Sequence, residues 1–200
     1  MAFIKIKLKI PDWLDRIFVW PVLEYRKLKY GYPYRRIYLG NRKWAIVDPD
    51  DYYRLAGFKW CAIGQNGTFY AVTGIQVSPQ EIKLVRMHRL IMNAPDGVLV
   101  DHRSGLSLDN RKDNLRFATH SQNICNRPKK KLDNVSSKFI GVSFNKHMGK
   151  WSAKICCQYK QIWLGYFNSE IDAARAYDRA AIKYHTVFAR LNFPEGIYLP

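Results

Sequence analysis

Short runs in which apolar and polar residues alternate are spread along the chain, and this spacing is typical of strands. Asp48 followed by Pro49 is a helix-start signal, so we expect a short helix from Pro49 to Leu55. A second short helix should begin near Thr119 or Ser121, either of which could cap it. Strands are expected at residues 44–47, 58–63, 68–77, 82–87, 98–102 and 115–118. This order predicts a small α+β unit over residues 44–126.

The last third of the chain predicts a second unit. Three runs with strand pattern lie at residues 139–144, 151–157 and 162–167. Ser169 is placed to cap a helix that continues from Glu170 to about Tyr184. Alanines recur along that helix, and such a face of small residues allows close packing on a sheet. We therefore expect a three-stranded antiparallel sheet packed on one helix within residues 138–200.

Two further segments do not have the pattern of a domain. Residues 1–43 are basic and aromatic, with Gly31 and Pro33 as breakers, and predict an extension that either contacts DNA or packs on the next domain. Residues 127–137 are polar and basic, which is typical of a linker.

Charge indicates the class of partner. The chain has 33 Lys and Arg against 16 Asp and Glu, a formal net charge of +17, which favours nucleic acid first and an anionic membrane surface second. The N-terminal apolar run at residues 17–23 is too short to span a bilayer and contains a proline, so no membrane partner or secretory signal is expected. The four cysteines form no C-x-x-C pair, so we expect no structural zinc and interpret them as reduced thiols in a cytoplasmic, nucleoid-associated protein.

One constellation carries catalytic chemistry. Asp101-His102 is followed by Asn114 and then by Asn123. Phosphodiester hydrolysis needs a base that activates water and a cation that neutralises the charge of the transition state. Carboxylate and amide oxygens are hard ligands suited to Mg²⁺, and a neutral histidine beside them can accept a proton.

Residues 100–127 resemble the HNH family of nucleases, through Val100-Asp101-His102, the loop that leads to Asn114-Leu115-Arg116, and Ser121-Gln122-Asn123. The resemblance implies a ββα-metal finger in which His102 is the general base and Asn114 orients it. Asp101 and Asn123 would hold a divalent metal, Mg²⁺ first, which Mn²⁺ could replace. Arg103 and Arg116 flank this centre and are either phosphate contacts or surface charge.

The C-terminal stretch resembles the Apetala-two (ethylene-response-factor) DNA-binding domain. Its carrying motifs are Gly149-Lys150-Trp151, Trp163-Leu164-Gly165-Tyr166-Phe167, the alanine-rich helix at residues 173–181, and Asn192-Phe193-Pro194. The resemblance implies a sheet that lies in the major groove of double-stranded DNA. Expected base or phosphate contacts are Ser143, Asn145, Lys150, Trp151, Lys154, Gln161 and Trp163. For both tryptophans, packing within the domain is an alternative, and the departures from the plant pattern at Ser143, Asn145, Lys154 and Cys156 leave the target sequence open.

These features predict the fold class α+β, with a ββα-metal HNH domain followed by a three-stranded sheet on one helix. The first functional hypothesis is a metal-dependent, site-specific homing endonuclease that nicks DNA, as a monomer. The alternative is a sequence-specific DNA-binding transcription regulator with an inactive finger. An RNA-binding basic protein is a third and weaker possibility.

Overall fold

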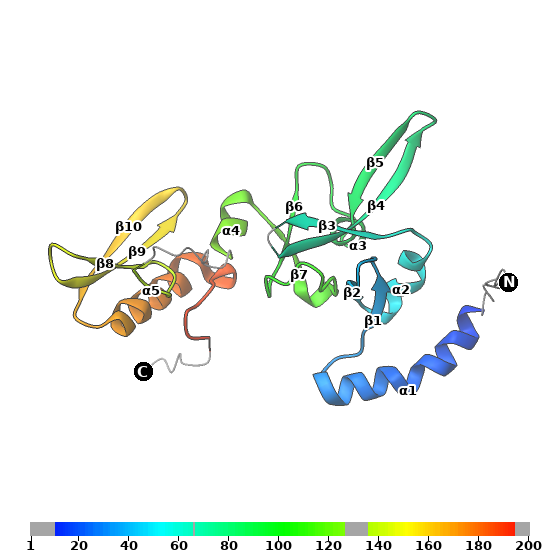
Figure 1. Ribbon diagram of the computed structural model, residues 1–200, viewed down its shortest axis with the longest axis horizontal. Coiled ribbons are helices and arrows are strands. Elements are labelled where there is room, and N and C mark those ends of the chain that lie inside the picture. The colour runs from blue at the N-terminus through cyan, green and yellow to red at the C-terminus, as the bar shows by residue number, and fades with distance from the viewer. Residues whose placement is uncertain (1–10, 66, 127–135, 195–200) are drawn as a thin grey trace. The chain divides into compact units, whose positions relative to one another are not determined.

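The computed structural model describes residues 11–65, 67–126 and 136–194 (Figure 1). The chain divides into two compact units, Met1–Ala94 with Leu106–Leu115 and Pro95–Gly105 with Arg116–Pro200. Apart from residues 136 and 137, the expected basic linker lies outside the described residues. Within the described ranges, no helix is both long and apolar enough to cross a membrane.

The first unit begins with a helix, within the segment that the sequence predicted to be a basic and aromatic extension. α1 (Asp12–Tyr30) has acidic residues in its first turn and lysines in its last, a charge order that favours a helix, and it continues past Pro21. It ends at Gly31, whose φ of 82° is the left-handed conformation that terminates helices. An ion pair ties α1 to its unit, because both terminal nitrogens of the Arg35 guanidinium donate to one carboxylate oxygen of Asp15 at 2.9 Å.

Two small sheets make up the rest of this unit. β1 pairs antiparallel with β2 across the boundary that was expected between residues 43 and 44, and the second sheet has the order β3-β4-β5. The core lies around Val47, Leu55 and Met87, all fully buried. The elements are β1 (Arg35–Tyr38), β2 (Trp44–Val47), α2 (Pro49–Ala56), β3 (Cys61–Gln65), β4 (Thr68–Ser78), β5 (Glu81–Arg86), α3 (Met87–Ile91) and η1 (Lys112–Asn114).

Two expected strands differ from those observed. The strand predicted at residues 58–63 begins only at Cys61, because Trp60 turns inward and its indole donates to the backbone oxygen of Leu55 at 2.8 Å. The strand predicted at 82–87 ends at Arg86, and Met87 instead begins helix α3, which the sequence pattern did not predict. Asp48 precedes α2 as expected, but its carboxylate accepts from the backbone N–H of Lys112 at 2.8 Å rather than from the helix.

The second unit contains two strand–helix groups. β6 (Leu99–His102) pairs with β7 (Leu115–Ala118), and α4 (His120–Cys125) follows, capped reciprocally by Thr119 and Gln122. The second group is the expected three-stranded antiparallel sheet, of order β10-β9-β8, followed by a helix: β8 (Val142–Asn145), β9 (Lys150–Cys157), β10 (Lys160–Phe167), α5 (Glu170–His185) and η2 (Thr186–Phe188). The mixed α+β architecture is thereby confirmed, whereas a metal finger at β6, β7 and α4 stays a prediction.

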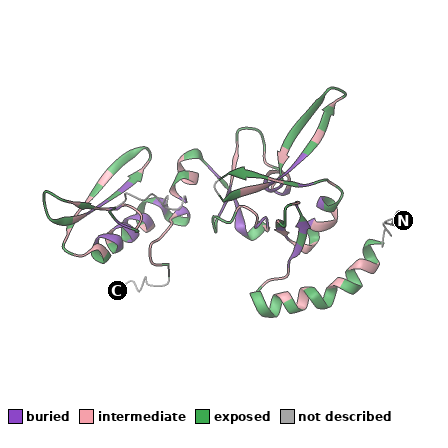
Figure 2. Ribbon diagram, viewed as in Figure 1, coloured by how far each residue is buried: buried purple, intermediate pink, exposed green. Residues whose placement is uncertain are grey.

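The core of the second group lies between the sheet and α5, as the buried residues in Figure 2 show. Ser169 caps α5 by accepting from the backbone N–H of Ile171 at 3.2 Å, as the sequence predicted. The small residues of α5 let the helix lie close to the strands, so that one face of the sheet is covered and the other is not. The buried residues of this core are Val142, Ala153, Ile155, Ala173, Ala174, Tyr177, Ala180 and Ala181.

Candidate nucleic-acid interface

The uncovered face of the β8–β10 sheet presents polar and aromatic side chains. Alternate residues of a strand point to opposite faces, and pairing aligns neighbours across strands. Lys154 pairs with Trp163, Cys156 with Gln161, and Ser152 with both Ser143 and Tyr166, which places these seven residues on one side. Their neighbours Ala153 and Ile155 face α5 and are fully buried.

A bulge in β10 adds a second aromatic ring to this face. The pairing register shifts between Trp163 and Gly165, so that Leu164 has no partner of its own in β9. Strict alternation would place Trp163 and Tyr166 on opposite faces, but the extra residue brings both to the open face. Their rings lie 5.3 Å apart, and Trp163 is 59% exposed.

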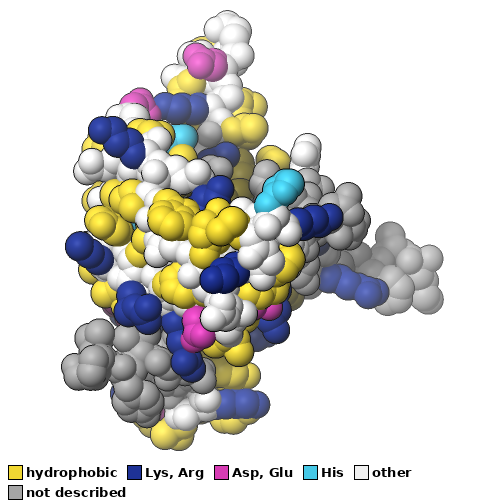
Figure 3. All heavy atoms as spheres, turned by 90° about the vertical axis from the view of Figure 1, so that its left-hand side faces the viewer, with side chains coloured by type: hydrophobic (Ala, Val, Ile, Leu, Met, Phe, Trp, Pro, Cys, Tyr) yellow, Lys and Arg dark blue, Asp and Glu magenta, His cyan; other side chains and the backbone are white. Residues whose placement is uncertain are grey.

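This sheet is a region of positive charge. Residues 138–167 contain no Asp or Glu but have five lysines, Lys138, Lys146, Lys150, Lys154 and Lys160. The acidic residues of the group, Glu170, Asp172 and Asp178, all lie on α5 behind the sheet. In Figure 3 lysine and arginine side chains lie around a band of hydrophobic ones, with a few acidic side chains among them. The acid-free, lysine-bearing strands of the sheet attract phosphate without regard to sequence.

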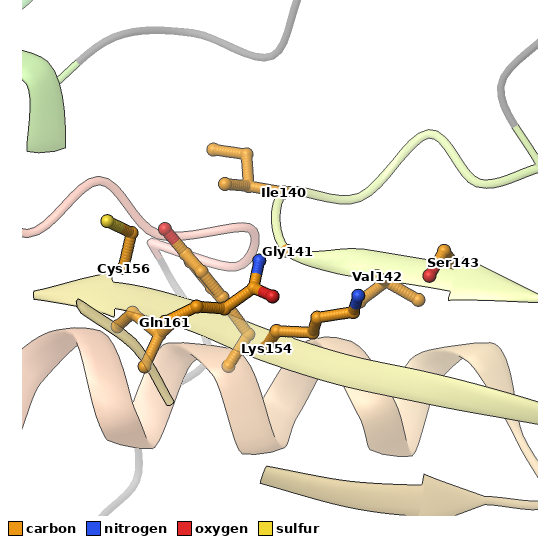
Figure 4. A pocket seen from close by; sticks show the side chains of 9 residues that line it. Ile140, Gly141, Val142, Ser143, Lys154, Cys156 and Gln161 are labelled. Carbon is orange, nitrogen blue, oxygen red and sulfur yellow. The ribbon is translucent and has the colours of Figure 1, made fainter. Parts of the chain in front are cut away.

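A shallow hollow of about 350 Å³ lies beside β8, lined by residues that include Ser143, Lys154, Cys156 and Gln161. In Figure 4 the Lys154 side chain extends toward Val142 and Ser143. The hollow depends on Gly141, whose φ is +73° and whose backbone oxygen accepts from Lys154 N–H at 2.9 Å. A Cβ atom there would come within 2.1 Å of the Tyr177 ring, so the close approach requires glycine.

Most of the expected DNA contacts lie on the open face. Ser143, Lys154, Gln161 and Trp163 are on it by pairing, and Asn145 and Lys150 pair with each other in the same orientation at its end. Trp151 is on the other face, packed against the core with its ring 5.1 Å from that of Phe144. For Trp151 the packing alternative therefore agrees with the structure.

Asn145 is already engaged by its own domain. Its side-chain oxygen accepts from the backbone N–H groups of His147 and Met148, at 3.0 and 3.1 Å, and shapes the β8–β9 turn. Its side-chain nitrogen donates to the hydroxyl of Tyr166 at 3.0 Å. Tyr166 was not expected on this face, and the signal that could have found it is Gly165, since a glycine inside a strand often marks a bulge.

Burial raises two pKa values beneath the sheet. The pKa of Tyr177 rises to about 12, first because the ring is buried and then because Cys125 and Asp178 lie near it. The pKa of the Cys125 thiol is also raised, first by burial and then by the neighbouring Cys157 and Cys156. The cysteines of the described chain are free, as expected.

The expected nuclease residues are divided between the two units. In the second unit Asp101 and His102 are adjacent at the end of β6, and both are buried. Arg116 donates to the Asp101 carboxylate from Nε at 2.8 Å and from a terminal nitrogen at 2.7 Å. The Asn126 amide donates to both carboxylate oxygens, at 3.2 and 3.1 Å, and to the backbone oxygen of His102 at 2.8 Å.

In this arrangement the Arg116 guanidinium is engaged by groups of its own unit rather than open to a ligand. Its guanidinium also donates to the backbone oxygen of Val187 and lies 3.9 Å over the Phe188 ring. Arg116 is only 9% exposed, which does not fit the phosphate contact considered for it. Arg103, in contrast, is exposed. Asn126, which follows the last turn of α4 and lies three residues beyond Asn123, was missed by the sequence analysis.

Asn114 and Asn123 each have hydrogen bonds within their own unit. Asn114, in the first unit, is buried and donates to the backbone oxygen of Asp109 at 2.7 Å. Asn123 is half-buried in α4, and its backbone N–H donates to Thr119. A cation at Asp101 would have to compete with the guanidinium of Arg116 for the carboxylate. Among the described residues, no three His, Cys, Asp or Glu side chains are grouped to hold a metal ion.

Comparison with known proteins identifies one part of the chain. Residues 137–186 match the family model of the AP2 domain. Over 63 residues the chain is 44% identical to the AP2-like ethylene-responsive transcription factor TOE2 of Arabidopsis thaliana, covering 32% of this chain and 13% of that protein. It is 38% identical over 90 residues to the dehydration-responsive element-binding protein 2E of the same plant, covering 40% and 36%. An APETALA2-like protein 2 of Oryza sativa subsp. japonica is 47% identical over 58 residues, covering 29% and 13%. The chain therefore spans only a small part of these curated relatives.

These comparisons correct the main functional prediction. Two of the similar proteins are named as a transcription factor and a DNA-element-binding protein. The residues that match the AP2 family model, 137–186, include the β8–β10 sheet and α5. The homing endonuclease is thus wrong as the description of this chain, and the alternative, a DNA-binding regulator, is the one that the relatives support. The expectations of an enzyme and of a divalent metal rest on residues 44–126, outside the matched range, and stay predictions.

Proposed function

We propose that this chain is a sequence-specific DNA-binding regulator that contacts double-stranded DNA with the open face of the β8–β10 sheet. The observation that carries the proposal is the asymmetry of the domain. One face of the sheet is packed on α5, and the other offers Lys154, Gln161 and Trp163 from strands that contain no acidic residue.

The chemistry of the face suits both parts of specific recognition. Lys154 and its neighbouring lysines neutralise phosphate and position the sheet, which carries no sequence information. Ser143 and Gln161 offer hydroxyl and amide groups that donate and accept at base edges in the major groove. Trp163, more than half exposed, supplies apolar contact area.

Measurements of DNA binding by a matched pair of lysine variants test this proposal. Lys154→Ala removes one charge from the open face, and Lys183→Ala removes one from the exposed side of α5 behind the sheet. On a DNA site selected from a random library, Lys154→Ala should weaken binding and reduce the slope of log K against log salt by about 0.9, the value for one phosphate contact. Lys183→Ala should leave both quantities unchanged.

Fluorescence anisotropy over a salt series measures these effects, with single-stranded RNA as a competitor. If Lys154→Ala and Lys183→Ala changed the affinity and the salt slope equally, the open face would not be the DNA-binding surface. Competition by RNA as strong as that by the selected DNA would favour the RNA-binding alternative. A further variant, Gln161→Ala, should change the selected sequence rather than the salt slope, since an amide that reads a base edge releases no counterion.

A further inference from the structure

The sheet formed by β1 and β2 in the first unit has one covered and one open face (Figure 1). Tyr38 pairs with Trp44 and Arg36 with Ile46, which places these four residues on the same side. The side chains that alternate with them lie on the other side and are all buried: Arg35, Ile37, Ala45 and Val47. The β1–β2 sheet therefore packs into the core of its unit through one face, and the other faces solvent.

Two aromatic rings lie next to each other on the open face. Tyr38 is 54% exposed and Trp44 is 48% exposed, although tyrosine and tryptophan usually bury more of their surface than this. Their ring centroids are 4.8 Å apart, and the ring planes are tilted by 53°, so the rings do not cover each other face to face. Exposed rings on a strand are the surface on which unpaired bases stack in proteins that bind single strands.

The charge around these rings is positive. Residues 25–47 contain seven lysines and arginines and no Asp or Glu. Of these, Arg36 lies on the open face beside Tyr38, and Arg42 is exposed in the turn that joins the two strands. The carboxylate of Asp109, which pairing places opposite Ile46, is buried, and its two oxygens accept from Arg111 at 2.8 and 2.6 Å. Its charge is thus neutralised within the unit.

We propose that the open face of the β1–β2 sheet binds an unpaired strand of DNA, with bases stacked on Tyr38 and Trp44 and phosphates beside Arg36 and Arg42. This contact is additional to the one proposed for the β8–β10 sheet, and it involves different residues and a different form of DNA. The choice of DNA rather than RNA rests on the proposed function, whereas the stacking surface rests on the β1–β2 sheet alone.

Two other occupants fit this face less well. In a duplex the bases already stack on one another, so the faces of the Tyr38 and Trp44 rings would have no base to cover them. A protein partner needs an apolar centre from which charge is largely absent. Besides the two rings, the open face of β1 and β2 has one apolar side chain, the half-buried Ile46, and it also carries the charge of Arg36.

Binding of the full chain to a fluorescein-labelled oligothymidylate, which cannot pair with itself, tests the proposal by fluorescence anisotropy. Trp44→Leu and Tyr38→Leu should each weaken binding about tenfold, because each removes the ring on which one base stacks. Trp44→Phe keeps a ring and should weaken binding about threefold or less. The matched control is Trp13→Leu, which removes a tryptophan of α1 that is 65% exposed and should bind like the wild type. Circular dichroism checks that each variant is folded.

A salt series with the same oligonucleotide tests the role of the charge. Arg36→Gln should reduce the slope of log K against log salt by about 0.7, the value for one phosphate contact on a single strand. The amide of the new Gln can still donate to the hydroxyl of Tyr34, which accepts from Arg36 at 3.1 Å in the wild type. An unchanged slope would overturn the assignment of phosphate to this face.

The selected duplex separates this proposal from that for the β8–β10 sheet. Trp44→Leu should weaken oligothymidylate binding and leave duplex binding unchanged, whereas Lys154→Ala should weaken duplex binding. Failure of the wild type to bind oligothymidylate, or ring variants without effect on that binding, would overturn the β1–β2 proposal while the Lys154 result still decides the other. An equal loss of duplex binding in Trp44→Leu would overturn it in favour of a duplex contact. Tighter binding of oligouridylate than of oligothymidylate would overturn it in favour of RNA.

Discussion

Replacing Asp101 by Asn should destabilise the second unit, because it leaves the buried guanidinium of Arg116 without its counter-charge. The side chains of Asp101 and Arg116 are 7% and 9% exposed, so solvent screens their interaction little. Breaking a buried, hydrogen-bonded ion pair on one side costs about 3–5 kcal/mol. The amide oxygen of the new Asn could still accept one of the Arg116 hydrogen bonds. We therefore expect a loss of about 3 kcal/mol in the free energy of unfolding.

Urea unfolding followed by circular dichroism measures this loss. Asn123→Ala is the control, since Asn123 is half-buried in the same β6–β7–α4 group, and it should change stability by about 0.5 kcal/mol or less. Asp101→Asn combined with Arg116→Met should cost less than the two single changes added together, because removing the guanidinium also removes the unpaired charge. An Asp101→Asn protein as stable as the wild type would refute the assignment of Asp101 to a structural ion pair.

The core of the DNA-binding group gives two further predictions. Gly141→Ala should lower the free energy of unfolding by about 3 kcal/mol, because the added Cβ would both occupy a strained φ and clash with the Tyr177 ring. Gly149→Ala is the control: its φ is +60° but its surroundings are open, so it should lower the free energy of unfolding by about 1 kcal/mol. Equal shifts in melting temperature for the two variants would contradict the clash. Folding raises the pKa of Tyr177 from 10.0 to about 12, so its contribution to stability is fully present below pH 10 and is lost as the pH rises toward 12. Tyr177→Phe should flatten that alkaline loss in thermal melts, and superimposable pH profiles would exclude Tyr177 as its origin.

Local signals in the sequence were sufficient for much of the C-terminal fold. Ser169 caps α5 as predicted, and Thr119, one of the two candidates with Ser121, caps α4, because a capping hydroxyl acts on the backbone within its own turn. Where tertiary contacts compete, the local pattern was a poorer guide. Asp48 was expected to cap α2, but a backbone N–H from residue 112 takes its carboxylate. Met87 continues an apolar alternation in sequence, yet it begins a helix whose side chains enter the core.

The candidate interface shows the same division. Alternation along the strands was enough to group Lys154, Gln161 and Trp163, because side chains two residues apart share a face. It could not show that Trp151 faces α5 rather than DNA, since the face that is covered depends on where the helix packs. It also could not show that a bulge turns Tyr166 to the open side. The main functional prediction rested on Asp101, Asn114 and Asn123, whose residue types match a nuclease motif, and it is corrected because the similar proteins are transcription factors. The roles expected of these three residues themselves stay predictions.

The sequence by itself determined the composition of the chain's surfaces: an acid-free, lysine-bearing set of strands, an alanine-rich helix, and an N-terminal segment rich in tryptophan and tyrosine. These properties follow from residue type and from spacing within one element. Only the tertiary structure decided which of those residues remain available. Arg116 and Asp101 neutralise each other because β6, β7 and α4 bring them together, and Trp13 and Leu28 stay exposed because α1 packs through its other side. Burial and pairing are properties of packed elements, and no single segment of the sequence specifies them.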